Sequence, residues 1–441
     1  MTSRKWTDLS RAGESANAGE FCYSLVERLY PLCRSITGAG TRETLEILGE
    51  YIDIQISEIA TGTSVFDWTV PKEWNIRGAF IETLAGEKII DFKDSNLHVV
   101  SYSTPIDDIV SLDELQQHLH SIPEHPDWIP YRTAYYNETW GFCLSENQRR
   151  SLCEDRYRVC IDSDLAPGYL NYGEYFLKGD SDEEFLIFTH VCHPSLCNDN
   201  LSGISIAVRI AQTLRELPSL NRSYRFVFAP ATIGSITWLS QNQHKLGNIE
   251  AGLVLAVAGD PGTLTYKRNR NPDSYIDRIV EQVLSSRGAP YDIVEFSPWG
   301  YDERQFCSPG IDLPIGSLTR TPNGCYPEYH TSADNLDLVR PEFLADSLSA
   351  YLEVLDVFDN NGNFVNLQPH GEPQLGKRGL YRKTGGQQSI ENSILAKLWV
   401  LNQSDGQHSL LDIANRANMH FEDIRAAAEA LLDADLLREQ S

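Results

Sequence analysis

Apolar residues recur along the middle of the chain in two alternating patterns. Short runs of mostly apolar residues predict buried strands at 157–162, 173–177, 185–189, 224–229 and 252–257. Between these runs, apolar residues repeat at helical spacing at 203–217, 235–243 and 275–287. Strands that alternate with helices of this length indicate an α/β fold, with a mostly parallel sheet flanked by helices on both faces.

The remaining patterns divide the chain into further units. Helices predicted at 21–30, 41–52 and 339–358 complete an α/β domain that we assign to 19–53 and 137–360. Residues 54–136 predict a mainly β insertion, with one helix at 112–120 and short strand-like runs at 64–70, 78–82, 88–92 and 98–102. Residues 361–390, rich in Gly, Asn, Gln and Pro, are typical of a linker.

The last residues, 391–441, have the pattern of a separate domain. Their apolar residues predict short helices around Leu398, Ile413 and Ile424, and Leu436 with Leu437 predicts a short strand. This order resembles a winged-helix domain. The segment carries four Lys and Arg against nine Asp and Glu, a net charge of −5. Because binding to DNA requires a basic face, we expect a packing or oligomerisation module, with a homo-oligomer as one option.

Composition indicates a soluble cytoplasmic protein. The 441 residues include 37 Lys and Arg against 62 Asp and Glu, a net charge of −25, which disfavours nucleic acid and anionic membranes as partners. No apolar run is long enough to span a membrane, and the first residues lack the apolar core of a signal peptide. The nine cysteines show no paired framework, as expected for reduced thiols.

Candidate chemistry appears where a buried strand ends, in FLIFTHVCHPSLCNDNLSG at 185–203. His190, His193 and Asp199 follow the strand, and the carboxyl ends of strands are where α/β sheets bind their ligands. Imidazole and carboxylate are nitrogen and oxygen donors that zinc accepts, and the Cys192 thiolate is a further possible ligand. The structural alternative is that His190 ends the strand and Asp199 caps the following helix.

A second motif, YHTSADNLDLV from Tyr329, places His330 before a polar turn. Together, TH…NDNLSG and YHTSADNLDLV resemble the zinc aminopeptidase superfamily, which includes leucyl aminopeptidases, glutamate carboxypeptidase and glutaminyl cyclases. The chain is most similar to an uncharacterised aminopeptidase-like subfamily that has a C-terminal winged helix and is often encoded beside polysaccharide-biosynthesis genes. Its signatures extend over the whole chain, as YPLCRSITGAG at Tyr30, FDWTVPKEWNI at Phe66, NLHVVSYSTP at Asn96, WGFCLS at Trp140 and YDERQF at Tyr301.

The resemblance implies one zinc ion held by His190, Asp199 and His330. His193 is then an alternative ligand or a residue that supports the ligands. Two further carboxylate ligands of di-zinc members have no match, because Thr232 stands at one position and LAVAGD, with Ala256 and Ala258, at the other. A zinc ion with three protein ligands keeps a position open for water, as hydrolysis requires.

The resemblance also shows what is missing. Its general base is a Glu in Pro-Glu-Thr-Ile-Gly, and this chain has Ala231 there, whose methyl group accepts no proton. Substitute carboxylates are Glu328, Asp302 and Glu303, each of which has a loop salt bridge as its structural alternative. Arg320 and Arg304 are candidates for binding a substrate carboxylate, and Tyr301 and Tyr326 for donating to an oxyanion. Surface or core packing roles are the alternative for these four.

These residues predict a zinc-dependent, aminopeptidase-like amide hydrolase that acts on a small peptide or an aminoacylated small molecule. A single-zinc aminoacyl transferase or cyclase is the alternative enzyme. The alternative without catalysis is a metal-binding scaffold that lost its activity at Ala231.

Overall fold

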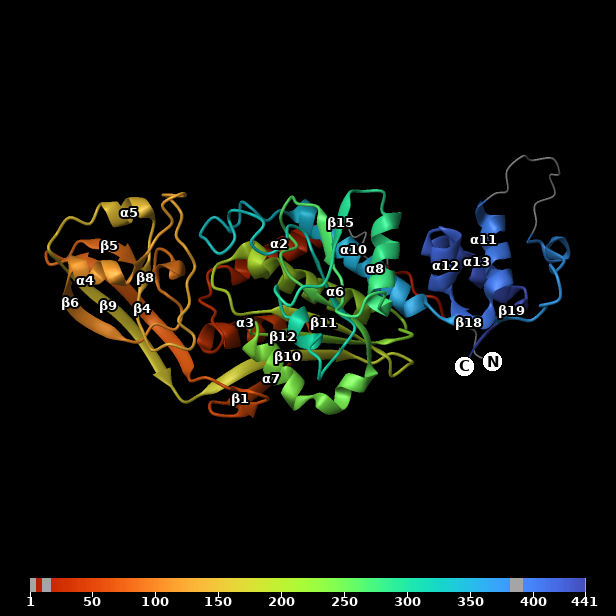
Figure 1. Ribbon diagram of the computed structural model, residues 1–441, viewed down its shortest axis with the longest axis horizontal. Helices are drawn as coiled ribbons and strands as arrows, with labels where there is room; N and C mark the ends of the chain where they lie inside the picture. Colours follow the sequence, from red (N-terminus) through yellow and green to blue (C-terminus); the bar gives the residue numbers. More distant parts are fainter. Residues whose placement is uncertain (1–4, 10–16, 381–391, 441) are drawn as a thin grey trace.

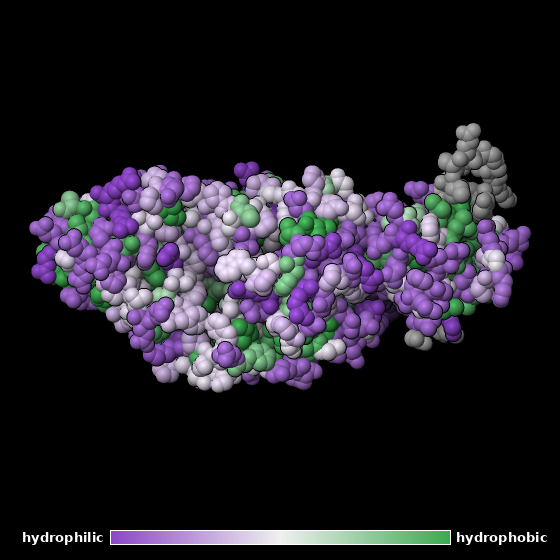
Figure 2. Space-filling model, viewed as in Figure 1, coloured by the Kyte–Doolittle hydropathy of each residue, from purple (hydrophilic) through white to green (hydrophobic). Residues whose placement is uncertain are grey.

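A computed structural model describes residues 5–9, 17–380 and 392–440 of the chain. Its parts lie in a row along the long axis of the molecule, with the insertion at one end, the large sheet in the middle and the C-terminal unit at the other end (Figure 1). Hydrophilic residues cover most of the visible face, and hydrophobic residues form small separate patches on it (Figure 2). None of the described helices combines the length and the apolar character needed to cross a membrane.

The middle unit of the described chain is built on an eight-stranded sheet in the order β1-β10-β12-β11-β13-β16-β14-β15. Its central strands run parallel: β12 (Ser223–Ala229), β11 (Glu184–His190), β13 (Ile249–Leu255) and β16 (Ile315–Thr319). The edges introduce antiparallel pairs: β1 (Gln55–Ala60) with β10 (Tyr169–Leu177), β10 with β12, and β14 (Leu264–Lys267) with β16, while β15 (Tyr291–Val294) runs parallel to β14. The predicted α/β fold is therefore confirmed, with a mixed sheet.

Helices cover both faces of this sheet. Alternate side chains of β11 point to opposite faces, so Phe185 and Ile187 enter one core, and Leu186 and Phe188 enter the other. The first core is covered by α2 (Ala18–Leu29), α6 (Gly203–Glu216), α8 (Tyr275–Ser286) and α10 (Pro341–Asn360). The second is covered by α7 (Ile233–Gln241) and the short α9 (Glu303–Phe306). The short helix α3 (Ala39–Gly49) lies against β10. The helices predicted for this unit are all present within a few residues.

The insertion has its own sheet, in the order β5-β4-β9-β6. Its strands are β5 (Lys88–Asp91), β4 (Glu73–Thr83), β9 (Arg156–Ala166) and β6 (Ile106–Ser111), and α4 (Leu112–Gln117) and α5 (Glu146–Arg150) accompany them. Two-stranded pairings are formed by β2 (Ser64–Val65) with β3 (Trp68–Thr69) and by β7 (Leu119–His120) with β8 (Phe142–Cys143).

Two predictions in this part of the chain are wrong. The strand expected at 157–162 in the central sheet is β9, which pairs with β4 and β6 of the insertion. Burial alternates along β9, which is typical of a sheet with one solvated face and unlike the continuous burial of β11 and β12. The expected strand at 98–102 is replaced by the 3₁₀ turn η1 (Asn96–His98) and isolated bridges at Val99 and Ser101.

The C-terminal unit has the predicted winged-helix arrangement of α11 (Asn392–Gln403), α12 (Leu410–Ala417) and α13 (Phe421–Asp433). Its three-stranded sheet joins β18 (Asp405–Ser409), β17 (Asn363–Asn366) and β19 (Leu437–Glu439). Strand β17 lies in the segment predicted as linker, so that prediction is wrong at its start. Of the segment, 381–390 lies outside the described residues.

The C-terminal unit is docked on the α/β unit by polar contacts that are partly buried. Arg278 of α8 pairs with Asp412 of α12, and Gln282 donates to the Met419 carbonyl over 2.9 Å. Arg425 of α13 lies 3.2 Å from the Asp356 carboxylate of α10, and the backbone N–H of Leu9 also donates to that carboxylate. These contacts support the packing role proposed for the unit.

Arg425→Met is expected to lower the thermal unfolding midpoint, and more strongly at pH 8 than at pH 5. Burial raises the pKa of Asp356 to about 6, and Arg425 opposes that shift. Because the raised pKa makes the folded state bind more protons, this carboxyl favours folding most below its unfolded pKa and less as the pH rises through 6. Leaving a buried charge without its partner costs about 3–5 kcal/mol.

Scanning calorimetry at both pH values measures the effect, with exposed Arg416→Met as the matched control. An equal shift for both variants, or the same loss at both pH values, would show that the Arg425–Asp356 pair is not a docking contact.

Candidate metal centre

The candidate ligands meet at the carboxyl ends of the parallel strands. His190 is the last residue of β11, and Asp199 lies in the segment between β11 and α6. The Nε2 atom of His190 lies 2.9 Å from Oδ1 of Asp199. The other oxygen, Oδ2, lies 3.0 Å from Nε2 of His330 and 3.9 Å from Nε2 of His193. One buried carboxylate is thus surrounded by three imidazoles.

Asp334 joins the two loops that carry these ligands. Its carboxylate accepts the backbone N–H groups of Asn198 and Asp199 over 2.6 and 3.0 Å, and its own carbonyl accepts that of Cys197. Burial raises the pKa of the Asp334 carboxyl to about 7, and the Asp199 charge adds to the effect. Sequence reasoning gave Asp334 no role, although the SADN turn after His330 pointed to it.

Two asparagines fix the approach to Asp199. The Asn200 amide donates to Thr189 over 2.8 Å and to the Leu255 carbonyl over 3.1 Å, and it lies 3.3 Å from Nδ1 of His190. The Asn198 amide donates to Asp260 over 3.0 Å. Both side chains therefore anchor the NDN segment to the end of β13 and the loop after it, and this explains the polar run in the sequence without making either residue a ligand.

The electrostatics of the cluster fit a cation. Burial alone would raise the pKa of Asp199, but the imidazoles of His193, His190 and His330 outweigh it and hold that pKa well below its usual range. Burial lowers the pKa of His193 well below its usual value, against the attraction of the Asp199 carboxylate. Within the described residues no Lys or Arg forms an ion pair with Asp199. Three nitrogens around one carboxylate are a donor set suited to zinc.

The choice between His193 and His330 as third ligand stays a prediction. Donor atoms of His190, His193 and Asp199 lie within 4.8 Å of one another, a spacing that a single ion can bridge. His330 is closer to Asp199 than His193 is, but it approaches the oxygen opposite to the one that faces His190.

Aromatic rings enclose the imidazoles. Tyr301 stacks on His190 with ring centroids 5.4 Å apart, and Tyr329 stacks on His330 at 3.9 Å. Tyr131, from the insertion, contacts the rings of both His193 and His330 at 5.2 Å, and its backbone N–H donates to the His330 carbonyl over 2.8 Å. The insertion therefore forms part of the centre. Sequence reasoning missed this, although the Tyr-rich run at 131–136 was a signal.

Ala231 lies in the turn between β12 and α7, and its N–H contacts the Cys192 sulfur over 3.2 Å. Asp302 lies beside this turn, where its Oδ1 accepts the Thr232 N–H over 2.7 Å and the Ser235 hydroxyl over 2.6 Å. Among the described residues, Oδ2 of Asp302 is buried without a hydrogen-bond partner. Burial raises the pKa of Asp302, a change that makes a carboxylate a stronger proton acceptor.

The other predicted carboxylates are placed less well. Glu303 is buried and pairs with Lys267 over 2.7 Å, and burial raises its pKa against that ion pair. Glu328 is half-buried, and no contact in the described part of the chain joins its carboxylate to the histidine cluster.

The four predicted substrate-binding residues also differ in how their contacts relate them to the candidate centre. Arg304 donates to the Thr232 hydroxyl over 3.3 Å and lies over the Trp299 ring, beside the Ala231 turn. Tyr301 has a buried hydroxyl that makes no hydrogen bond of normal geometry within the described part of the chain, and the Tyr329 phenol lies beside it.

Tyr326 is buried, and its hydroxyl lies 3.5 Å from the Asp334 carboxylate. The role predicted for Arg320 is not supported by its contacts, because its guanidinium is held by α10: it pairs with Asp346 over 2.8 Å and donates to the Ser347 hydroxyl.

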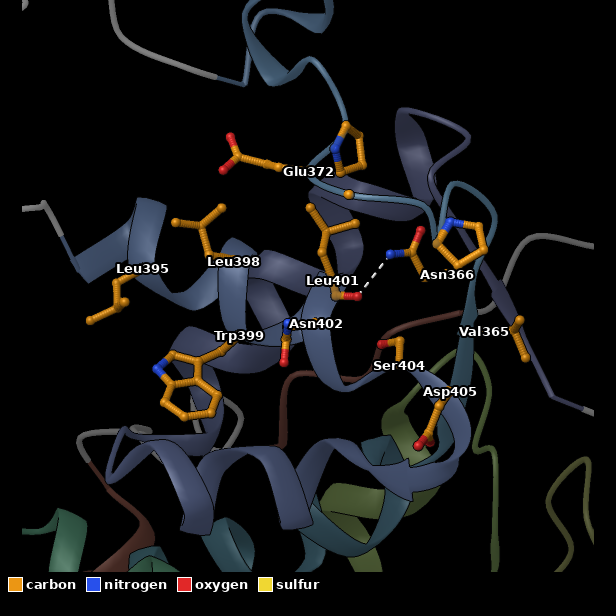
Figure 3. A pocket seen from close by; sticks show the side chains of 13 residues that line it. Val365, Asn366, Glu372, Leu395, Leu398, Trp399, Leu401, Asn402, Ser404 and Asp405 are labelled. Atoms are coloured by element: carbon orange, nitrogen blue, oxygen red, sulfur yellow. Dashed lines mark hydrogen bonds between the residues drawn. The ribbon is translucent and has the colours of Figure 1, made fainter.

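A large cavity, of about 790 Å³, lies elsewhere, in the C-terminal unit. Figure 3 shows Leu395, Leu398 and Trp399 of α11 along it, and Asn366 donating to the Leu401 carbonyl over 2.8 Å. None of the candidate metal ligands lines this cavity. The candidate metal centre therefore lies outside this cavity.

The sequence of the chain matches a known protein family over most of its length. Residues 23–361 match the family described as a domain of unknown function (DUF4910). The chain belongs to the DUF4910 family. In this DUF4910 protein, residues 363–439 match a winged helix-turn-helix family, which agrees with β17 being the first strand of that unit.

A protein and a crystal structure from Clostridium acetobutylicum are similar to this DUF4910 chain over nearly its whole length. The protein has the provisional name of a polysaccharide biosynthesis protein with an aminopeptidase-like domain. It is 52% identical over 424 residues, which are 96% of this chain and 97% of the relative. A crystal structure of a provisionally named peptidase from that organism has 50% identity and a TM-score of 0.92, and covers 98% of both chains.

More distant structures share the fold of the DUF4910 unit. A zinc aminopeptidase from Bacillus subtilis has a TM-score of 0.56 at 13% identity, covering 76% of this chain and 94% of that one. A peptidase M28 precursor from Shewanella amazonensis has a TM-score of 0.57 at 14% identity, covering 80% and 95%. The aminopeptidase-like fold expected from the two motifs is confirmed.

Proposed function

We propose that this chain is a zinc-dependent amide hydrolase of the aminopeptidase type, acting on a small peptide or an aminoacylated small molecule. The observation that carries the proposal is the buried Asp199 carboxylate with an imidazole against each of its oxygens. Such a carboxylate is costly to bury unless a cation or several donors compensate it. The zinc aminopeptidase named among the structures of the same fold supports zinc as that cation.

His190, Asp199 and His330 would hold one zinc ion, with His193 as the alternative ligand. When bound there, zinc polarises a carbonyl and lowers the pKa of water. The chain's own contribution is orientation. Asn200 is placed to fix the His190 ring, and Asp334 fixes the backbone of Asp199.

Asp302 is our candidate for the proton acceptor in place of the missing Glu at position 231. It is preferred over Glu303, which pairs with Lys267, and over Glu328, whose carboxylate makes no contact with the cluster within the described residues. One oxygen of Asp302 is fixed by Thr232 and Ser235, which leaves Oδ2 to exchange a proton. A carboxylate held in this way is preorganised for general base catalysis.

Arg304 and Tyr301 are the candidate substrate contacts. Arg304 is within reach of the Ala231 turn and is positioned to pair with a substrate carboxylate. Tyr301, stacked on His190, is positioned to donate from its hydroxyl to a developing oxyanion.

The acidic winged-helix unit supports the proposal that nucleic acid is not a partner. Its α13 carries Glu422, Asp423, Glu429 and Asp433 and only one positive residue, Arg425, which is already paired with Asp356. This helix offers no basic face for phosphates.

Ala231 favours a second candidate function, aminoacyl transfer or cyclisation on the same single-zinc site. A reaction in which the substrate's own amine attacks the carbonyl does not require a base to activate water. A silent metal-binding scaffold is the outcome if neither reaction occurs.

Product analysis separates these functions. The protein, reconstituted with zinc, is incubated with a panel of aminoacyl amides and dipeptides, and products are identified by mass spectrometry. All three reactions release the amine of the cleaved amide: hydrolysis yields it with a free acid in equal amounts, transfer with a new amide on the acceptor, and cyclisation with a cyclic amide. Hydrolysis that is weakened in Asp302→Asn and retained in Glu328→Gln is the result expected. A new amide as the main product would overturn the hydrolase proposal.

A further inference from the structure

A groove of about 320 Å³ runs between the β2–β3 hairpin of the insertion and helices α7 and α9. Its two helical walls are the elements that hold the candidate centre: α7 begins directly after the Ala231 turn, and α9 follows Asp302. No role was predicted for this region from the sequence, although FDWTVPKEWNI, which begins in the hairpin, was one of the signatures.

The hairpin holds two aromatic rings at the groove, where they are exposed to solvent and one of them has a positive φ. Phe66 is 51% exposed and has a φ of 52°, a left-handed conformation that a bulky side chain rarely adopts. Trp68, two residues further on, is 37% exposed. Phe66 is the first residue of a two-residue hairpin turn, a position that usually takes Gly or Asn, so the hairpin presents this ring at the groove at a cost in backbone strain.

Aromatic contacts connect the groove with the metal centre. The Trp68 ring contacts Tyr136 at 5.5 Å, and Tyr136 contacts Tyr135 at 6.4 Å. The Tyr135 hydroxyl lies 2.7 Å from that of Tyr131, whose ring contacts His193 and His330. The hairpin at the groove therefore packs against the same aromatic cluster that contacts the histidines.

The chemistry of the lining selects the ligand. Phe66, Trp68 and the apolar side of α7 offer a flat apolar surface, and Asp67, Gln243, Gln305 and Ser308 offer hydrogen-bond donors and acceptors around it. None of the described residues that line the groove carries a positive charge, which disfavours a phosphate or a carboxylate. A purely apolar side chain would use only the apolar part of this lining.

We propose that this groove binds a neutral pyranose ring, as the sugar part of the substrate. A pyranose has an apolar C–H face that stacks on aromatic rings and an edge of hydroxyl groups for the amide and carboxylate side chains. The substrate would then be an aminoacylated or N-acylated sugar. The identification of the bound sugar as part of the substrate rests on the proposed hydrolase function, but the binding of a sugar in the groove does not.

Saturation-transfer NMR on the full-length protein tests binding without turnover. The probes are the methyl pyranosides of glucose, galactose and N-acetylglucosamine, with phenylalaninamide as the probe for an apolar side chain. At least one pyranoside is expected to bind, with a dissociation constant on the order of 1 mM. Phe66→Ala and Trp68→Ala are each expected to weaken it by roughly three- to tenfold, the loss of one aromatic contact.

Two further variants make the test specific. Gln305→Leu keeps the side-chain volume and is expected to weaken the pyranoside but not phenylalaninamide, so it remains informative if the hairpin variants fold poorly. Tyr291→Ala, with an equally exposed aromatic ring on β15 at the far edge of the sheet, is expected to change nothing. Absence of pyranoside binding, or binding unchanged in all three groove variants, would overturn the proposal. If the protein hydrolyses amides but binds no pyranoside, the sugar site is refuted and the proposed function is retained. If it binds a pyranoside but hydrolyses no amide, the proposed function is refuted and the sugar site is retained.

Discussion

Ala231→Glu is expected to raise the rate of amide hydrolysis by about 10²–10⁴-fold, the usual contribution of a positioned general base, with Asp302 serving in the wild type as a weak substitute for that Glu. The residue lies in the turn between β12 and α7, beside Cys192 and next to the Thr232 N–H that Asp302 accepts. A carboxylate introduced there would take a proton from water that the wild-type methyl group cannot take. The comparison uses kcat/KM of both proteins on aminoacyl amides with zinc present.

Ala231→Gln is the matched control, because it has the shape of Glu without a group that accepts the proton. It should stay within a few-fold of wild type. If the wild type already hydrolyses amides briskly and Glu adds nothing, position 231 is not the empty base position, and Asp302 acts alone. If both proteins bind zinc and neither acts on any amide, the scaffold function gains support.

His330→Ala is expected to remove bound zinc while the protein stays folded. The imidazole provides one of the two close contacts of Asp199, yet it lies on a loop outside the two large cores, so its loss opens no cavity in them. Zinc content after dialysis, measured by atomic emission, should fall from about one ion per chain to near zero. The thermal midpoint of the metal-free protein should stay close to that of metal-free wild type.

His193→Ala distinguishes the two ligand sets. If His193 only supports the ligands, zinc remains bound with affinity about 10–100-fold weaker. If instead His193→Ala loses the ion and His330→Ala keeps it, the ligands are His190, His193 and Asp199, the set whose donors lie within 4.8 Å of one another. His408→Ala, in the exposed sheet of the C-terminal unit, controls for the loss of one imidazole and should keep full occupancy.

The sequence by itself determined the α/β order, the positions of the parallel strands β11, β12 and β13 but not of β16, and the polar residues that follow β11. This was possible because burial on both faces leaves a continuous apolar run, as in β11 and β12, and because the candidate ligand His190 follows such a run directly. The two motifs also brought Asp199 and His330 together, although 131 residues separate them.

Only the tertiary structure decided which elements are partners. An alternating strand such as β9 shows that one face is buried but not against which sheet, and β17 is too short to be recognised before it pairs with β18 and β19. The partner of a charged side chain is equally hidden, so Arg320 looked available until α10 was seen to hold it. Tyr131 reached the histidines from the insertion by long-range pairing of 129–131 with 330–332, and local pattern carries no record of such contacts.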